Sequence, residues 1–403
     1  MGEHEQLSTY GTLKNIFKVI YAPQKAFKEI IQKPRYIGPV LLMILFVLAN
    51  VGFGYALLSK TYLDQTMPQA SELDKWTEDT AFWTSNANIT LNTLDYINGT
   101  YYGNRSIEFS LIAGSQVWMQ LNASSSLKCS DPDGYKSLSF RVKWIEPAAN
   151  PSNVSLYMFS ATPQDTFYQN ITDRLNQTGV WNNLTIGLGH ESGDWTQIGG
   201  ADWGNITSLE FEFTWPTDSN ITLLIDGIFF HDLYKSEIEI ASGLLVSSTN
   251  PFSPINALMQ FVIQWVILGG LLYIIPKMFR VKTVWKLLLI IAGFVLITYV
   301  MRMIFFTIVY VASPEIRYPL EYLGGVPGEW ETASDLLFQA MSTTYQIMWY
   351  IDKLVWAWTV ALCTIALRSI FTLSWVKSVL ISISSYAFYI ILLIFVAPLA
   401  VLL

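Results

Sequence analysis

Apolar positions recur at every second residue through much of the block between residues 60 and 250. In "SLSFRVKW", residues 137–144, and in "SLEFEFTW", residues 208–215, one face is apolar and the other carries polar side chains such as Glu210 and Glu212. This period is typical of β-strands with one face in a core and the other in water. Turn-forming Pro, Gly, Asn and Asp separate the runs, so the block predicts an antiparallel sandwich of about eight strands.

Long apolar runs flank this block. The first, residues 37–58, holds 22 uncharged positions, enough for a helix rising ~1.5 Å per residue to cross a hydrocarbon core ~30 Å thick. The other four runs are residues 255–276, 287–312, 343–367 and 378–403. The pattern therefore predicts an α-helical membrane bundle of five transmembrane helices with an inserted all-β sandwich.

The predicted organisation follows from these two patterns. Residues 1–36 form a cytoplasmic N-terminal amphipathic segment, residues 37–58 the first transmembrane helix, residues 60–250 the sandwich and residues 251–403 four further transmembrane helices.

The distribution of charge predicts the orientation of the chain. Residues 60–250 hold 22 acidic and 9 basic residues, whereas the remainder holds 9 acidic and 15 basic ones. The basic residues gather before the first run and at residues 277–286 and 368–377, and such clusters stay on the cytoplasmic side of a membrane. We therefore expect a multi-pass cell-membrane protein with a cytoplasmic N-terminus, whose residues 60–250 and C-terminus are exterior.

Ten N-x-S/T sequons in the block indicate a glycosylated exterior domain, although Asn- and Thr-rich turns also produce sequons by chance. The sequons begin at Asn88, Asn98, Asn104, Asn122, Asn153, Asn170, Asn176, Asn183, Asn205 and Asn220.

The segment from Trp181 through "GHESGDWTQIGGADWGNITSLEFEF" to "LLIDGIFF" resembles the jelly-roll, galactose-binding-like modules of carbohydrate-binding proteins. The resemblance covers roughly residues 88–232 and implies a jelly-roll sandwich that binds glycan through exposed aromatic rings. The residues it suggests are the stacking platforms Trp195 and Trp203, with Asp194, Asp202 and Gln197 as hydrogen-bonding neighbours. The alternative is that these tryptophans fill the sandwich core or cap its edge.

The same resemblance implies a structural calcium ion near the final core strand. Asp226 is the candidate ligand, because carboxylate oxygens suit calcium. An Asp before a Gly is also a common turn former, so the two interpretations stay open.

The N-terminal segment sets Phe27 and Ile30 among lysines, a pattern typical of a helix at an anionic lipid surface or of a short helix packed against a bundle. With Pro23 before them and "LRSIFTLSWVKS" after the tryptophan-rich fourth run, these features resemble the Yip family of Rab-interacting, five-span membrane proteins. That resemblance implies a membrane-organising or trafficking scaffold with a cytoplasmic protein partner.

Three charges lie within the predicted transmembrane runs: Arg302 in the third run, and Asp352 and Lys353 in the fourth. We expect Arg302 of the third run to pair with Asp352 of the fourth. Such a pair either fixes helix register or marks a transport path.

Several functions are excluded by what the sequence does not contain. His4, His190 and His231 lack metal-ligand spacing, and the sequence has no phosphate-binding loop or nucleophile elbow. We therefore expect no enzyme, no cofactor beyond the calcium ion and, without a basic stripe outside the membrane, no nucleic-acid partner.

Three hypotheses for the function remain. The first is an exterior glycosylated sandwich that binds glycan or surface material and is displayed by a lipid-embedded bundle. The second is a Yip-like scaffold whose sandwich shields the protein or docks partners, and the third is a transporter.

Overall fold

The computed structural model describes residues 13–130, 132–160, 162, 164–175, 177–240 and 250–400, except for the side chains of residues 124 and 396–400. The chain divides into two compact units, which are described separately below. The helical unit comprises residues 1–61, 236–316 and 340–403, and the sandwich unit comprises residues 62–235 and 317–339.

Among the described residues, five helical segments are long and apolar enough to cross a bilayer, judged by length and composition. They are α3 (Ile37–Lys60), α6 (Pro254–Met278), α7 (Trp285–Val295) continued by α8 (Ile297–Ala312), α10 (Glu329–Phe371) and α11 (Trp375–Ala400). The first four contain one apolar run of the sequence each, and α11 contains the last run as far as residue 400. The shorter helices are residues 13–21, α2 (Pro23–Gln32) and α5 (Glu237–Ile240).

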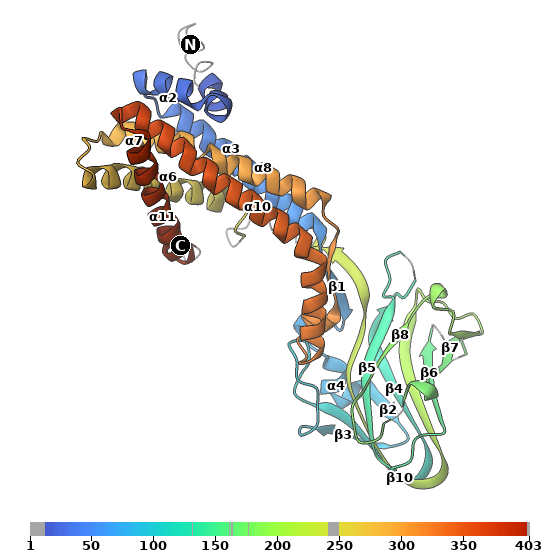
Figure 1. The fold of residues 1–403 in the computed structure, drawn as a ribbon. Helices are drawn as coiled ribbons and strands as arrows, with labels where there is room; N and C mark the ends of the chain where they lie inside the picture. Colours follow the sequence, from blue (N-terminus) through green and yellow to red (C-terminus); the bar gives the residue numbers. More distant parts are fainter. Residues whose placement is uncertain are drawn as a thin grey trace. The chain divides into compact units, whose positions relative to one another are not determined.

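Aromatic contacts and one ion pair join α3, α8 and α10, which run side by side in Figure 1. Phe53 of α3 lies against Phe306 and Tyr310 of α8, with ring centroids 5.8 and 5.4 Å apart. Arg302 of α8 binds Asp352 of α10 through two contacts, Nε to Oδ1 at 2.5 Å and Nη2 to Oδ2 at 3.2 Å. The pairing expected from the sequence is confirmed.

The sandwich unit is built mainly from antiparallel strands. They are β1 (Thr61–Met67), β2 (Trp83–Ser85), β3 (Asn88–Asn92), β4 (Ser106–Leu127), β5 (Ser137–Glu146), β6 (Asn153–Phe159), β7 (Thr166–Asn170), β8 (Asn182–Gly187), β9 (Thr196–Ile198), β10 (Ile206–Ser236) and β11 (Ile316–Tyr318). The short helices described in this unit are α4 (Lys75–Glu78), α9 (Leu320–Leu323) and single turns at Ala70–Glu72, Thr80–Phe82, Thr172–Arg174 and His190–Ser192.

The two longest strands, β4 and β10, belong to both layers of the sandwich. They pair antiparallel along most of their length, and the ladder is interrupted between Thr214 and Ser219 of β10. Pro216 falls in this interruption and cannot donate a backbone hydrogen bond, which suits a corner. Figure 1 shows β10 bending at this end of the sandwich.

The corner divides the strands into two sheets. The first sheet contains β3, the start of β4, the end of β10, β5 and β8. The second sheet contains β2, the end of β4, the start of β10, β6, β7 and β9. Strands β1 and β11 add to the far end of β10.

One apolar core fills the space between the sheets. The alternating residues of β5 and β10 face it as their sequence predicted, and the rings of Phe140 and Phe211 meet with centroids 4.8 Å apart. Trp144 and Phe213 are completely buried there. Burying side chains of this size contributes roughly 1.5–3 kcal/mol each, so period-two alternation explains most of what holds the sheets together.

The predicted sandwich is confirmed, with two differences in extent. The described residues form 11 strands rather than about eight, because β2, β9 and β11 have three residues each and show no alternating pattern. The sandwich unit ends at residue 235 rather than 250 and also takes in residues 317–339, which the sequence assigned to the membrane half.

Candidate functional site

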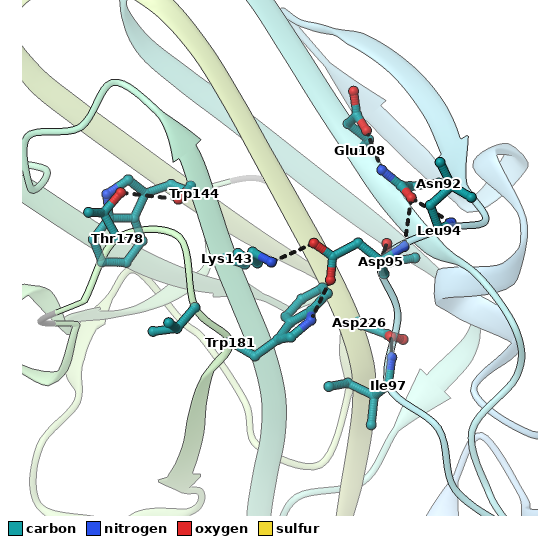
Figure 2. Close-up of polar contacts among 12 residues, drawn as sticks. Asn92, Leu94, Asp95, Ile97, Glu108, Lys143, Trp144, Thr178, Trp181 and Asp226 are labelled. Atoms are coloured by element: carbon teal, nitrogen blue, oxygen red, sulfur yellow. Dashed lines mark hydrogen bonds and ion pairs between the residues drawn. The ribbon is translucent and has the colours of Figure 1, made fainter.

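The outer face of the first sheet is covered by the chain's own loop, residues 93–105. Asp95 fastens the start of this loop, since one carboxylate oxygen accepts a hydrogen bond from the indole of Trp181 at 2.9 Å and the other binds the ammonium of Lys143 on β5. Figure 2 shows Asp95 between these two side chains, with Ile97 near Asp226. The polar groups of this face are therefore occupied by the protein itself.

A buried pair of carboxyl groups fastens the loop a second time. Asp226 of β10 accepts hydrogen bonds from the backbone N–H of Ile97 at 2.6 Å and of Gly227 at 2.7 Å. Asp74, next to it, accepts from Gly103 N–H at 2.7 Å and from the Thr77 hydroxyl at 3.0 Å. Burial raises the pKa of the Asp226 carboxyl well above its ordinary value, and the charge of Asp74 raises it further. We therefore expect one of the two carboxyl groups to keep its proton above the pH at which an ordinary aspartate loses it.

The start of α10 covers the same sheet. Arg141 of β5 donates two hydrogen bonds to the carboxylate of Glu329, at 2.9 and 2.6 Å, and a third to the hydroxyl of Tyr102. Asn183 of β8 donates to the same carboxylate at 2.8 Å. A small apolar cluster around Tyr102, with Leu320 of α9, lies beside this network. Residues 317–339 are thus part of the sandwich, and the first sheet does not offer a free face.

The outer face of the second sheet is different, because its side chains remain in contact with solvent. Strand pairing aligns one residue from each of six strands in a single row across this face. The row consists of Thr84, Gln120, Glu210, Tyr157, Tyr168 and Thr196, each of which is partly or fully exposed. Six strands separated by ~4.8 Å give a row about 24 Å long, which suits an elongated ligand.

Aromatic rings and carboxylates stand together in and beside this row. Tyr157 and Tyr168 lie with ring centroids 5.2 Å apart, and Phe159 stacks on Tyr157 at 6.4 Å. Trp118 pairs with Glu212 in the strand register. We call the surface formed by these groups the open face; its residues are Trp118, Gln120, Tyr157, Phe159, Tyr168, Glu210 and Glu212.

The two glutamates of the open face influence each other. Partial burial raises the pKa of the Glu210 carboxyl, and the neighbouring charge of Glu212 raises it further. Among the described residues, no cation pairs with either carboxylate. Their oxygen atoms are therefore available to hydrogen-bond donors from a ligand.

The two tryptophans suggested by the sequence lie in different environments. Trp203 is only 2% exposed, and its ring stacks on Phe167 with centroids 3.9 Å apart. It fills the core, as the alternative interpretation held, and no ring face is left for a sugar. Trp195 is partly exposed, packs edge-on against Trp203 at 5.3 Å and donates its indole N–H to the Gly187 carbonyl at 2.8 Å.

The three polar neighbours suggested with them make local contacts. Asp194 pairs with Arg174 at 3.2 Å, Asp202 accepts the Gly204 N–H at 2.8 Å, and Gln197 donates to the Ala201 carbonyl at 2.8 Å. All three are exposed, but the structure does not gather them around one aromatic ring.

The surroundings of Asp226 do not fit a calcium ion. Calcium requires six to eight oxygen ligands, whereas the oxygen atoms of Asp226 and Asp74 already face backbone N–H groups and a hydroxyl. Within the described residues, no group of three or more His, Cys, Asp or Glu could hold a metal. Asp226 instead precedes an irregularity in the pairing of β10 with β5. The next residue, Gly227, has φ +57°, and a Cβ atom at that position would lie 2.4 Å from the Tyr102 ring, so this turn of the backbone favours glycine.

The sequons lie at the surface wherever the structure describes them. Asn88, Asn98, Asn104, Asn122, Asn170, Asn183 and Asn220 are exposed, and Asn153 and Asn205 are partly exposed. Asn176 lies outside the described residues. Strand register places Asn122, Asn153 and Asn170 on the same side of the second sheet as the open face.

The sequence pattern of β6 could have predicted the open face, although the candidate residues chosen from the sequence did not include it. In "NVSLYMFSA" the core positions alternate with Ser155, Tyr157 and Phe159, so aromatic residues occupy the side of the strand that faces water. An aromatic residue on the polar side of an alternating strand is the feature that distinguishes this sheet.

Comparisons with known proteins concern the sandwich alone. No protein-family model matches the chain, and no curated protein does. The resemblance to the Yip family is therefore without support beyond the sequence features that suggested it.

Solved structures similar to part of the chain include carbohydrate-binding β-sandwiches. A carbohydrate-binding module of the β-sandwich superfamily is 14% identical over 37% of this chain and 57% of its own, just over half its length, with a TM-score of 0.26. A family 11 module from Clostridium thermocellum, in complex with a β-1,3-1,4-mixed-linked tetrasaccharide, is 13% identical over 41% of this chain and 94% of its own, with a TM-score of 0.27. At these values the similarity carries no conclusion about what this chain binds.

Proposed function

We propose that the protein binds glycan on the open face of its sandwich unit and is held in a membrane by its helical unit. The observation that carries the proposal is the row of partly exposed aromatic, amide and carboxylate side chains across six strands. The opposite sheet is covered by residues 93–105 and 317–339, so the second sheet supplies the free surface.

The chemistry of the open face suits a sugar. The apolar C–H face of a pyranose packs on an aromatic ring, for which Tyr157 and Tyr168 are available. Gln120 then donates or accepts hydrogen bonds at the hydroxyl groups on the edge of the sugar, and the carboxylates of Glu210 and Glu212 accept hydrogen bonds from them. Because no described cation pairs with Glu210 or Glu212, the face favours neutral or amino sugars over acidic ones.

The proposal includes orientation and glycosylation. Five apolar helices and the distribution of lysine and arginine support membrane insertion with the sandwich outside. Exposed sequons support glycosylation, and glycans on Asn122 or Asn170 would stand at the edge of the open face. We propose binding without turnover, so a bound oligosaccharide is expected to remain intact.

A glycan array tests this function. The purified full chain in detergent is applied before and after enzymatic removal of its own N-glycans, together with a Tyr157→Ala/Tyr168→Ala variant. The matched control is Tyr96→Ala, which removes an exposed tyrosine from the loop over the other sheet. We expect neutral or amino-sugar ligands to bind the wild type and the control but not the double variant. Equal binding by all three proteins, or no binding by folded wild type in either glycan state, would refute the proposal.

A further inference from the structure

A basic cavity lies at one end of the helical unit. It has a volume of about 340 Å³ and is formed by α2 and by the turn that joins α10 to α11. Its walls are Gln24, Lys28, Ile365, Arg368, Ser369, Thr372, Leu373 and Trp375. The volume lies within the range of roughly 300–1,000 Å³ that small-molecule sites occupy.

The two cations of this cavity have no opposing charge. Glu29 is the sole acidic residue between residues 6 and 61, and it pairs with Lys18 at 2.5 Å. No acidic residue occurs between residues 353 and 403. Among the described residues, no carboxylate pairs with Lys28 or Arg368, and the Arg368 guanidinium lies 4.0 Å above the ring of Trp375. Two unopposed cations held close together favour an anion between them.

Other groups at the same place complement an anion. Helix α11, 26 residues long, begins at Trp375, so the positive end of its dipole lies at the cavity wall. Ser369 and Thr372 add hydroxyl groups. Thr372 has φ +50°, a left-handed conformation that strains a β-branched residue and that glycine would adopt freely.

We infer that this cavity binds a phosphate monoester group, with Lys28 and Arg368 as its cationic contacts. Arginine binds two phosphate oxygens at once, and lysine contributes a point charge. Ile365, Leu373 and Trp375 give the cavity an apolar side. Helix α2 buries Phe27 and Ile30 while the preceding helical segment exposes Phe17 and Tyr21, which suits a site at a lipid surface.

Thermal unfolding of the full chain in detergent tests this site with three probes: phosphatidic acid, phosphatidylcholine and inorganic phosphate. Phosphatidic acid is expected to raise the unfolding temperature of the wild type, whereas phosphatidylcholine is not. Lys28→Gln/Arg368→Gln should need at least tenfold more phosphatidic acid for the same shift. Lys14→Gln/Lys33→Gln, which removes two exposed lysines outside the cavity, should match the wild type.

Two further measurements distinguish a lipid head group from a soluble phosphate compound and provide a variant that should not misfold. If millimolar inorganic phosphate displaces phosphatidic acid, the site takes a soluble phosphate compound; if not, it takes a lipid head group, and both results support an anion site. Thr372→Gly should fold at least as stably as the wild type yet bind more weakly. Equal weakening in the cavity and control double variants would overturn the inference, as would unchanged binding by Lys28→Gln/Arg368→Gln and Thr372→Gly.

Discussion

At the scale of single residues, the carboxyl pair Asp74 and Asp226 couples the stability of the sandwich to pH. Burial raises the pKa of both groups, and the ordinary aspartate value is 3.8. Above the ordinary value the folded chain keeps a proton that the unfolded chain has lost, so the contribution of this pair to stability is greatest at low pH and falls as pH rises through the raised pKa.

Replacing one acid by its amide should remove this dependence. In Asp74→Asn the amide oxygen can still accept the Gly103 N–H, while the NH₂ group donates to an ionised Asp226 without a shared proton. We expect a gain of about 1–2 kcal/mol over the wild type at pH 8 that disappears towards pH 4. Unfolding temperatures measured between these pH values provide the check, with the exposed Asp173→Asn as control. Parallel profiles for wild type and Asp74→Asn would show that no proton is shared.

The two tryptophans near β9 should respond differently to truncation. Trp203→Ala empties a fully packed position in the core and should cost about 3–5 kcal/mol. Trp195→Ala removes a partly exposed ring and one hydrogen bond, with an expected cost of about 1–2 kcal/mol. Thermal unfolding of the two variants measures the difference, and equal costs would contradict the core assignment of Trp203.

At the scale of elements, the start of α10 belongs to the sandwich because of Glu329. Its carboxylate accepts from Arg141, whose side chain is only 5% exposed. The local sequence did not predict this contact, because residues 141 and 329 are far apart in the chain. Glu329 is also the first residue of an apolar helix, a position where acidic residues are common. The predicted boundary of the sandwich was incomplete for that reason, whereas alternation within a strand and apolar run length, both local properties, predicted the strands and long helices well.

Neutralising Glu329 should loosen this attachment. Glu329→Gln leaves the Arg141 guanidinium buried beside a neutral amide, and we expect a loss of about 1–3 kcal/mol. Asp335→Asn, an exposed acid later in the same helix, is the matched control and should change stability by less than ~0.5 kcal/mol. Thermal unfolding and limited proteolysis near residues 324–328 report the effect. Identical behaviour of the two variants would exclude a role for this ion pair.

At the scale of the whole molecule, the chain covers one sheet of the sandwich itself and leaves the other exposed. Polar residues of the first sheet hold residues 93–105 and 317–339, whereas those of the second sheet form the surface that we propose for glycan. The sequence predicted glycan binding by resemblance, but it directed attention to Trp195 and Trp203. The residues of the open face come from separate strands and are brought together by strand register. The sequence of a single segment therefore could not predict this surface.

The most direct test of the open face is calorimetric titration of the full chain with the strongest ligand from the array. Tyr157→Ala and Trp195→Ala are compared with the wild type, since they probe the two candidate surfaces. We predict that Tyr157→Ala weakens binding at least tenfold, equivalent to about 1.4 kcal/mol, and that Trp195→Ala changes it less than twofold. Loss of binding in Trp195→Ala with unchanged affinity in Tyr157→Ala would contradict the account and place the ligand at the edge of the sandwich instead.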